Sequence, residues 1–315
     1  TQENFLGTGN RASFSFNNSE VNRNFGLNWL NPYWTDDGVS RELDAHYRKT
    51  NARDANLADY DLDQLGGGVI FGVPISEVNS VDLGLNFEHT EFIPGSDASD
   101  EVLAFRDLSD GEFNTVTLTA AWSRDQRDSV LLPTRGTFSR LGAEIAVPGL
   151  DLSFYKFTAR HQRFFPLFKD FTFVLDGEFG YGDGYGDTED LPLINNFFAG
   201  GIRSVRGYEG NTLGPRDSRG EPLGGSTRVV GNAELILPVP FARDVRSFRM
   251  TTFIDAGQVY GPDEDIDFGR LRYSAGVSAI WLSPLGPMTV SIAAPLNSES
   301  GDDTQPFQFT FGTSF

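Results

Sequence analysis

Apolar and polar residues alternate with a period of two along most of the chain, which is typical of β-strands with two different faces. The pattern is clear at 81–88, 115–122 and 270–282. It returns in the closing residues, where phenylalanine occupies positions 307, 309, 311 and 315. No segment shows a convincing period of 3.6. The pattern therefore predicts an all-β fold.

The alternation predicts about fourteen strands, and neither a domain-scale linker nor an internal sequence repeat interrupts them. We therefore expect residues 1–315 to form one domain. The expected strands are residues 8–18, 21–31, 38–50, 64–74, 78–91, 112–124, 137–147, 151–165, 169–182, 227–238, 246–259, 270–282, 286–295 and 305–315.

The connections between the expected strands alternate in length, and the long ones are acidic. Because neighbouring strands run in opposite directions, the long connections fall at one end of the sheet and the short ones at the other. Short turns at the periplasmic end and longer loops outside are typical of outer-membrane barrels. The short connections are 74–79, 166–170 and 283–287, and the long ones are 92–112, 183–227, 260–269 and 296–305.

A soluble β-sandwich or barrel is the alternative fold. Two observations favour a transmembrane antiparallel β-barrel. The apolar face is continuous and aromatic, in a chain with 28 phenylalanines. The polar face carries charged residues and many glycines, as a wide water-containing lumen would. A closed barrel also leaves no unpaired strand edge in lipid.

Composition excludes several function classes. The chain has no cysteine, which excludes a disulfide framework and a thiolate metal site. Its net charge of −19 argues against binding to nucleic acid. The sequence contains no run of about 18 apolar residues, so no transmembrane helix is expected. No signal peptide is visible at Thr1, and we expect a mature fragment of a longer protein.

The longest segment without a strand pattern is residues 183–227, and glycines crowd its centre at 200–216. A loop of this length in a compact chain is usually functional or disordered. Arg206 lies between Val205 and Gly207, which suggests a charge directed at a specific partner. We expect the loop to fold back into the lumen of the barrel.

Strand parity suggests partners for Arg206. In the strands expected at 227–238 and 246–259, Glu234 and Asp255 fall on the lumen face. Because an unpaired buried charge is costly, Arg206 is expected to pair with one or both of them. The alternative is that these carboxylates pair with Arg228 or Arg249 on the same face.

The centre of this loop resembles the sixth extracellular loop of the BamA family of outer-membrane-protein insertases, within a wider superfamily that includes secretion pores. The similarity covers essentially the whole chain. Its most specific motifs are Val205-Arg206-Gly207-Tyr208, the stretch Asn-Thr-Leu-Gly-Pro-Arg at 211–216, Ala233-Glu234-Leu235, Ile254-Asp255-Ala256-Gly257, residues 281–287 and Gln308-Phe309-Thr310-Phe311-Gly312.

The resemblance implies that the loop arginine is held by Glu234 and Asp255, with Val205, Gly207 and Tyr208 completing the loop latch. The family barrel has sixteen strands, so the first strand, most of the second and the periplasmic POTRA domains would be absent here. The resemblance implies that the protein acts through a seam between the first and last strands of the barrel. The seam residues expected here are Gln308, Phe309, Phe311, Gly312 and Phe315.

The resemblance further implies an assembly factor of the Gram-negative outer membrane that inserts β-barrel proteins by strand templating. The expected partners are unfolded barrel substrates, periplasmic accessory lipoproteins and outer-membrane lipid, with no cofactor and no metal. The alternatives are a polypeptide exporter of the two-partner-secretion type and a passive diffusion porin.

Enzymatic activity is not expected. The three histidines, His46, His89 and His161, lie on separate strands, and no spaced Ser/His/Asp set accompanies them. The alternating aspartates at 263, 265 and 267 lack the glycine and distal glutamate of a calcium loop, so a solvated external loop is expected.

Overall fold

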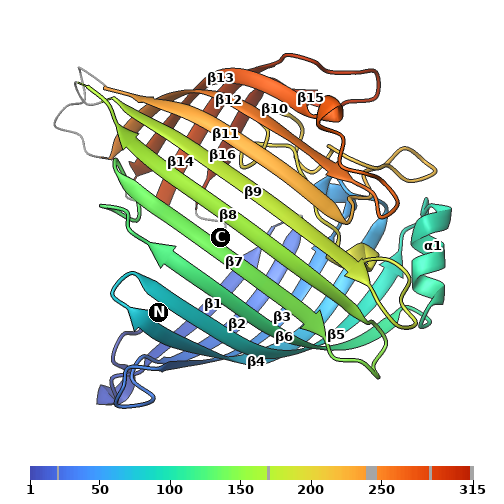
Figure 1. Ribbon diagram of the computed structural model, residues 1–315. Helices are drawn as coiled ribbons and strands as arrows, with labels where there is room; N and C mark the ends of the chain where they lie inside the picture. Colours follow the sequence, from blue (N-terminus) through green and yellow to red (C-terminus); the bar gives the residue numbers. More distant parts are fainter. Residues whose placement is uncertain (20, 169–170, 239–246, 284–285, 313–315) are drawn as a thin grey trace.

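The computed structural model describes residues 1–19, 21–168, 171–238, 247–283 and 286–312. Fourteen of its strands form one antiparallel sheet in chain order, curved into a barrel-shaped wall (Figure 1). The sheet is not closed, and β1 and β16 form its two edges. Its strands are β1 Arg11–Asn18, β2 Asn22–Asn31, β3 Ser40–Asn51, β4 Tyr60–Ser76, β5 Asn79–Pro94, β6 Glu112–Asp125, β7 Gly136–Ala146, β8 Phe154–Pro166, β9 Thr172–Gly184, β11 Thr227–Leu237, β12 Phe248–Tyr260, β13 Arg272–Ser283, β14 Gly286–Pro295 and β16 Phe307–Phe311.

These strands confirm the predicted all-β antiparallel fold, with different bounds. β4 begins at Tyr60, four residues before the alternation becomes clear. The last strand was expected to reach residue 315, but β16 ends at Phe311. Gly312 follows with a φ of 89°, outside the extended region. Phe315 lies outside the described residues.

The two faces of the sheet differ as the alternation predicts. On β5, Leu83, Leu85 and Phe87 point outward and are 46–48% exposed, since nothing in the chain covers them. Inward-facing Glu88 accepts a hydrogen bond from Gln64 on β4. The outer face is therefore apolar and the inner face polar, as a barrel wall between lipid and a wet lumen requires.

One short α-helix lies in a stretch where the sequence shows no convincing period of 3.6. α1, Asp100–Asp107, lies between β5 and β6, and the Ser99 side chain caps its first turn. Only Val102 and Phe105 are buried, so the helix is too short for a period of 3.6 to be visible. The short 3-10 helices are Phe5–Gly7, Arg53–Ala55, Leu193–Asn195 and Phe268–Arg270. Among the described residues, none of the helices is long and apolar enough to cross a membrane.

Several connections at the long-loop end share an apolar core, whereas Asp263, Asp265 and Asp267 are exposed, as expected for a solvated loop. Phe105 of α1 lies between two rings, with centroid distances of 5.0 Å to Phe92 and 4.8 Å to Phe113. Leu191 and Leu193 of the longest loop join the same core. Local alternation could not predict this core because each loop supplies only a few of its side chains.

The alternation of short and long connections holds only in part. At the short-turn end, residues 126–135 form an ordered turn. The Asp128 carboxylate accepts hydrogen bonds from the main-chain N–H groups of Thr134 and Arg135 and from the Thr134 hydroxyl. Partial burial alone would raise the pKa of Asp128, but these bonds lower it to about 2. Arg249 of β12 donates to the Pro133 carbonyl, which ties the turn to the opposite wall.

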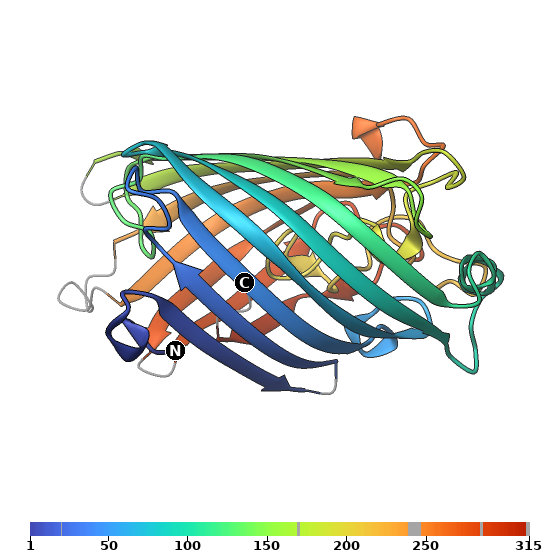
Figure 2. The same ribbon diagram turned by 90° about the horizontal axis from the view of Figure 1, so that it is seen from below.

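The longest loop, residues 185–226, lies inside the curve of the sheet (Figures 1 and 2). Its centre contains β10, Gly207–Tyr208, which pairs with β15, Thr304–Gln305, in the loop before β16. A loop segment is thereby held against the inner faces of β11 to β16.

Candidate functional site

Arg206 lies at the inner wall and contacts both carboxylates that parity indicated. Its Nε donates to Asp255 Oδ2 and its Nη2 to Asp255 Oδ1, each at 2.7 Å. The same Nη2 lies 2.6 Å from Glu234 Oε1. The alternative partners are engaged elsewhere: Arg228 pairs with Glu178, and Arg249 contacts the 126–135 turn.

Asp255 is fully buried and accepts further bonds, from the Arg206 main-chain N–H at 3.1 Å and from Asn232 Nδ2 at 2.8 Å. The Phe253 ring lies under the guanidinium, with 3.4 Å between Cζ and the ring centroid. Burial alone would lower the pKa of Arg206, but the two carboxylates raise it above its ordinary value. The arginine therefore stays charged although it is buried.

Val205 anchors the loop tip against the inner face of the sheet. We define the loop tip as residues 205–208. It is fully buried and packs with Val230 of β11 and Val259 of β12. A Cβ on Gly257 of β12 would lie 2.7 Å from Val205 Cγ2. The glycine in the Ile-Asp-Ala-Gly motif thus leaves room for the loop valine.

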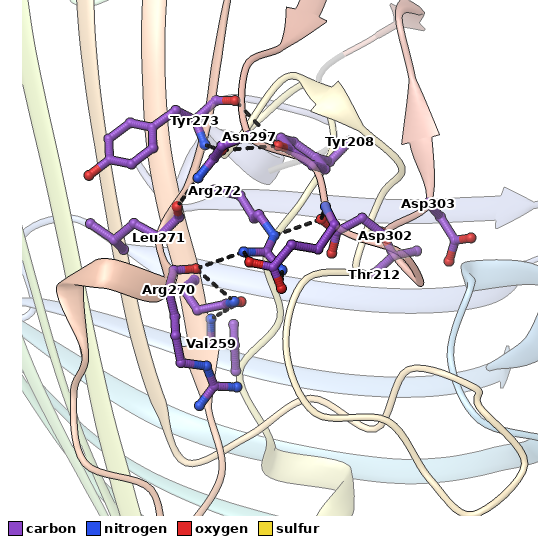
Figure 3. A network of polar contacts seen from close by, with 12 residues as sticks. Tyr208, Thr212, Val259, Arg270, Leu271, Arg272, Tyr273, Asn297, Asp302 and Asp303 are labelled. Carbon is purple, nitrogen blue, oxygen red and sulfur yellow. Dashed lines mark hydrogen bonds and ion pairs between the residues drawn. The ribbon is translucent and has the colours of Figure 1, made fainter.

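Gly207 and Tyr208 place the loop tip in contact with the last strands of the sheet. Gly207 has a φ of 89°, and an added Cβ would lie 3.1 Å from Ala293 Cβ of β14. Tyr208 is fully buried, and its hydroxyl donates to the Tyr273 carbonyl at 3.3 Å and lies 3.5 Å from Asn297 Oδ1 (Figure 3). A side chain at position 207 would be strained by the positive φ and tight against Ala293.

A polar network surrounds Tyr208 (Figure 3). Arg272 at the start of β13 donates through Nε to Asp302 at 2.6 Å and pairs with Glu299 at 2.9 Å. Asn297 makes two hydrogen bonds to the main chain at the start of β13. Its Oδ1 accepts from the Tyr273 N–H, and its Nδ2 donates to the Leu271 carbonyl. The loop of residues 296–306 is thereby fixed to β13 beside the loop tip.

The expected seam strand contacts the same loop tip. Gln308 of β16 faces inward, is 5% exposed, and donates through Nε2 to the Tyr208 carbonyl at 2.7 Å. Phe309 and Phe311 face outward and are each 52% exposed. The Gly312 N–H donates to the Pro287 carbonyl at 2.8 Å. Of the expected seam residues that the structure describes, Gln308 alone is hydrogen-bonded to the loop tip.

Sequence reasoning missed the contacts between this loop and the last one. The Asp303 carboxylate lies 2.7 Å from Arg216 Nη2, and the Asp303 carbonyl accepts from the Glu209 N–H. Parity places Gln308 on the inner face, but it cannot tell which loop residue meets it. Among the residues that the structure describes, no group of His, Cys, Asp or Glu is arranged to hold a metal ion.

Comparison with known proteins gives relatives of the same family. Residues 4–315 match the Omp85 superfamily domain. The whole chain is 37% identical to the outer membrane protein assembly factor BamA of Neisseria meningitidis and 27% identical to BamA of Nitratidesulfovibrio vulgaris, covering 44% and 39% of those proteins. The crystal structure of BamA from Haemophilus ducreyi lacking POTRA domains 1–3 superposes with a TM-score of 0.87 at 26% identity, covering 98% of this chain and 65% of that one.

The chain therefore spans less than half the length of these curated relatives. Their similarity confirms the resemblance to the BamA family and the expected location in the outer membrane of a Gram-negative bacterium. The match to the family extends over nearly every residue of the sheet and of the loop inside it. The chain belongs to the Omp85 superfamily.

Proposed function

We propose that this chain is the barrel part of an outer-membrane protein assembly factor, which folds β-barrel proteins and inserts them into the membrane. The proposal is supported by the name of its relatives, outer membrane protein assembly factor BamA, which are similar to it over its whole length. The structural observation that carries it is the loop tip, bound to the wall through Arg206 and to the last strand through Gln308.

The chemistry of such a factor is non-covalent. An incoming barrel protein has unpaired strand edges, whose N–H and C=O groups cannot remain unsatisfied in lipid. An exposed edge on the factor can pair with that strand by β-strand addition. β16 lies at the edge of the sheet and is the proposed template, with its outward Phe309 and Phe311 facing lipid.

Arg206 would act as a latch in this scheme. Glu234 and Asp255 hold the tip against β11 and β12, and the tip in turn supports β16 through Gln308. The seam strand would be positioned by a loop that is distant from it in sequence. We propose Val205, Arg206, Gly207 and Tyr208 as the latch residues on this basis.

The proposed partners are unfolded barrel proteins and outer-membrane lipid, with accessory lipoproteins binding mainly through periplasmic domains. No cofactor and no enzymatic activity are part of the proposal. The rival function is the export of one partner polypeptide through the lumen by a member of the same superfamily.

Depletion and complementation test the proposal. Cells depleted of the native protein would be complemented with wild type, with Arg206→Ala, or with Arg228→Ala as a control that removes a different inward arginine. We expect depletion and Arg206→Ala to lower the levels of many unrelated outer-membrane barrels, and Arg228→Ala to have a smaller effect. Loss of a single secreted protein, with barrel levels unchanged, would instead identify an exporter.

A further inference from the structure

Three arginines lie on the outward face of the sheet near its short-turn end. Arg41 is the second residue of β3, Arg124 the next to last of β6, and Arg163 the fourth from last of β8. Each shares its parity with outward apolar residues of its own strand, which are Leu43, Leu118 and Phe157, exposed by 42–51%. We call these three arginines the arginine belt.

The belt differs from two inward-facing arginines of the same wall. Inward Arg140 lies 3.6 Å from Asp82, and inward Arg160 lies 2.6 Å from Asp176. Within the described part of the chain, no ion pair joins Arg41, Arg124 or Arg163 to a carboxylate. The three belt arginines therefore lack the carboxylate partner that Arg140 and Arg160 have.

The surroundings of the belt are those of a membrane interface. The guanidinium of Arg41 lies 5.4 Å from the centre of the Trp34 ring, and that of Arg163 lies 4.7 Å from the Phe165 ring. The turns beyond the belt expose large apolar side chains, namely Tyr33 at 79% and Phe168 at 69%. Aromatic rings beside arginine are typical of the level where lipid headgroups begin.

An outward arginine at this level needs an anion. Its cost in lipid is highest at the midplane and falls toward the interface, where a headgroup can reach it. The planar guanidinium binds phosphate through two parallel hydrogen bonds. A carboxylate from the protein would satisfy the charge equally well, but the described residues supply none to the belt.

We propose that the arginine belt binds the phosphates of anionic phospholipids in the leaflet at the short-turn end. Each arginine would hold one headgroup against the aromatic ring or apolar strand beside it. The bound headgroups would determine how deeply the short-turn end of the barrel sits in the membrane. This inference rests on the outer-membrane location and is independent of the assembly function, so either can fail without the other.

Native mass spectrometry of the full-length protein in a neutral detergent tests the belt, with phosphatidylglycerol or phosphatidylcholine added as the probe. Wild type should bind phosphatidylglycerol more tightly, and each belt Arg→Gln change should weaken that binding about fivefold. The triple variant R41Q/R124Q/R163Q should bind both lipids alike, while the triple Lys variant should keep a preference. Arg23→Gln, on the outward face at the opposite end of β2, is the matched control.

Two results would overturn the proposal. One is a triple Gln variant that keeps the wild-type preference for phosphatidylglycerol. The other is an Arg23→Gln variant that loses as much binding as each belt variant, which would mean that net charge alone decides. Heat-modifiable mobility on gels would establish folding first, and the single variants would replace the triple variant if it does not fold.

Discussion

Neutralising Asp255 should release the loop tip far more than neutralising Glu234, although both carboxylates contact the same arginine. Asp255 has no exposed surface and accepts four hydrogen bonds, three from Arg206 and one from Asn232. The Glu234 side chain is 25% exposed and contacts Arg206 through one oxygen. The two substitutions, Asp255→Asn and Glu234→Gln, remove the same charge from these different environments.

The structure sets the size of each effect. Removing one partner of a buried, hydrogen-bonded ion pair costs about 3–5 kcal/mol, because the other charge remains buried. For Asp255→Asn this would raise the population of the released loop on the order of 10²–10⁴-fold. A partly exposed pair contributes about 1 kcal/mol or less, so Glu234→Gln should raise it roughly fivefold at most.

Limited proteolysis of the loop at residues 185–226 measures this population when reclosing is faster than cleavage. The cleavage rate should rise in the order wild type, Glu234→Gln, Asp255→Asn. Asp265→Asn, which removes a charge from an exposed loop, should cleave like wild type. Equal cleavage of the two site variants, or a larger effect from Glu234→Gln, would refute the argument from burial.

Three further outcomes follow from the geometry. Gly207→Ala should destabilise loop docking by about 1–3 kcal/mol because of its positive φ and the contact with Ala293, and hydrogen exchange of the loop should increase. Phe105→Ala should loosen α1 by about 3–5 kcal/mol, seen as lost exchange protection there, with the barrel still formed. Because the folded pKa of Asp128 is about 2 against an ordinary 3.8, its contribution to the 126–135 turn is present above about pH 4 and is lost as the pH falls through 2. Protection of that turn should follow this course, and Asp128→Asn should abolish the pH dependence.

The strands and the partners of Arg206 could be read from the sequence because both depend on a local period. Alternation places every second side chain on one face, so Glu234 and Asp255 share a face whatever the rest of the chain does. Parity left Arg228 and Arg249 open as partners of these carboxylates, and the resemblance to the BamA family favoured Arg206 on a loop that enters the lumen. In the structure, Val205 of this loop packs on β11 and β12.

The features that escaped prediction depend on contacts between distant segments. α1 forms where Phe105 packs between Phe92 and Phe113, and a helix of two turns carries no readable period. The hydrogen bond from Gln308 to Tyr208 joins residues 100 positions apart. Parity predicts that Gln308 faces inward, but it cannot predict which loop residue lies opposite.

The loop tip joins two parts of the wall that the sheet joins only through β13 and β14. Arg206 binds β12, while the Tyr208 carbonyl and the pairing of β10 with β15 hold β16 and the loop that leads to it. A displacement of β16 must therefore break these bonds or carry the tip with it. Because such coupling is reciprocal, any change that frees Arg206 must also lower the free energy needed to move β16. The loop arginine bound to β12 and the glutamine on β16 would then report on the same equilibrium, and loop release would rise in a Gln308→Leu variant whose Arg206 contacts are unchanged.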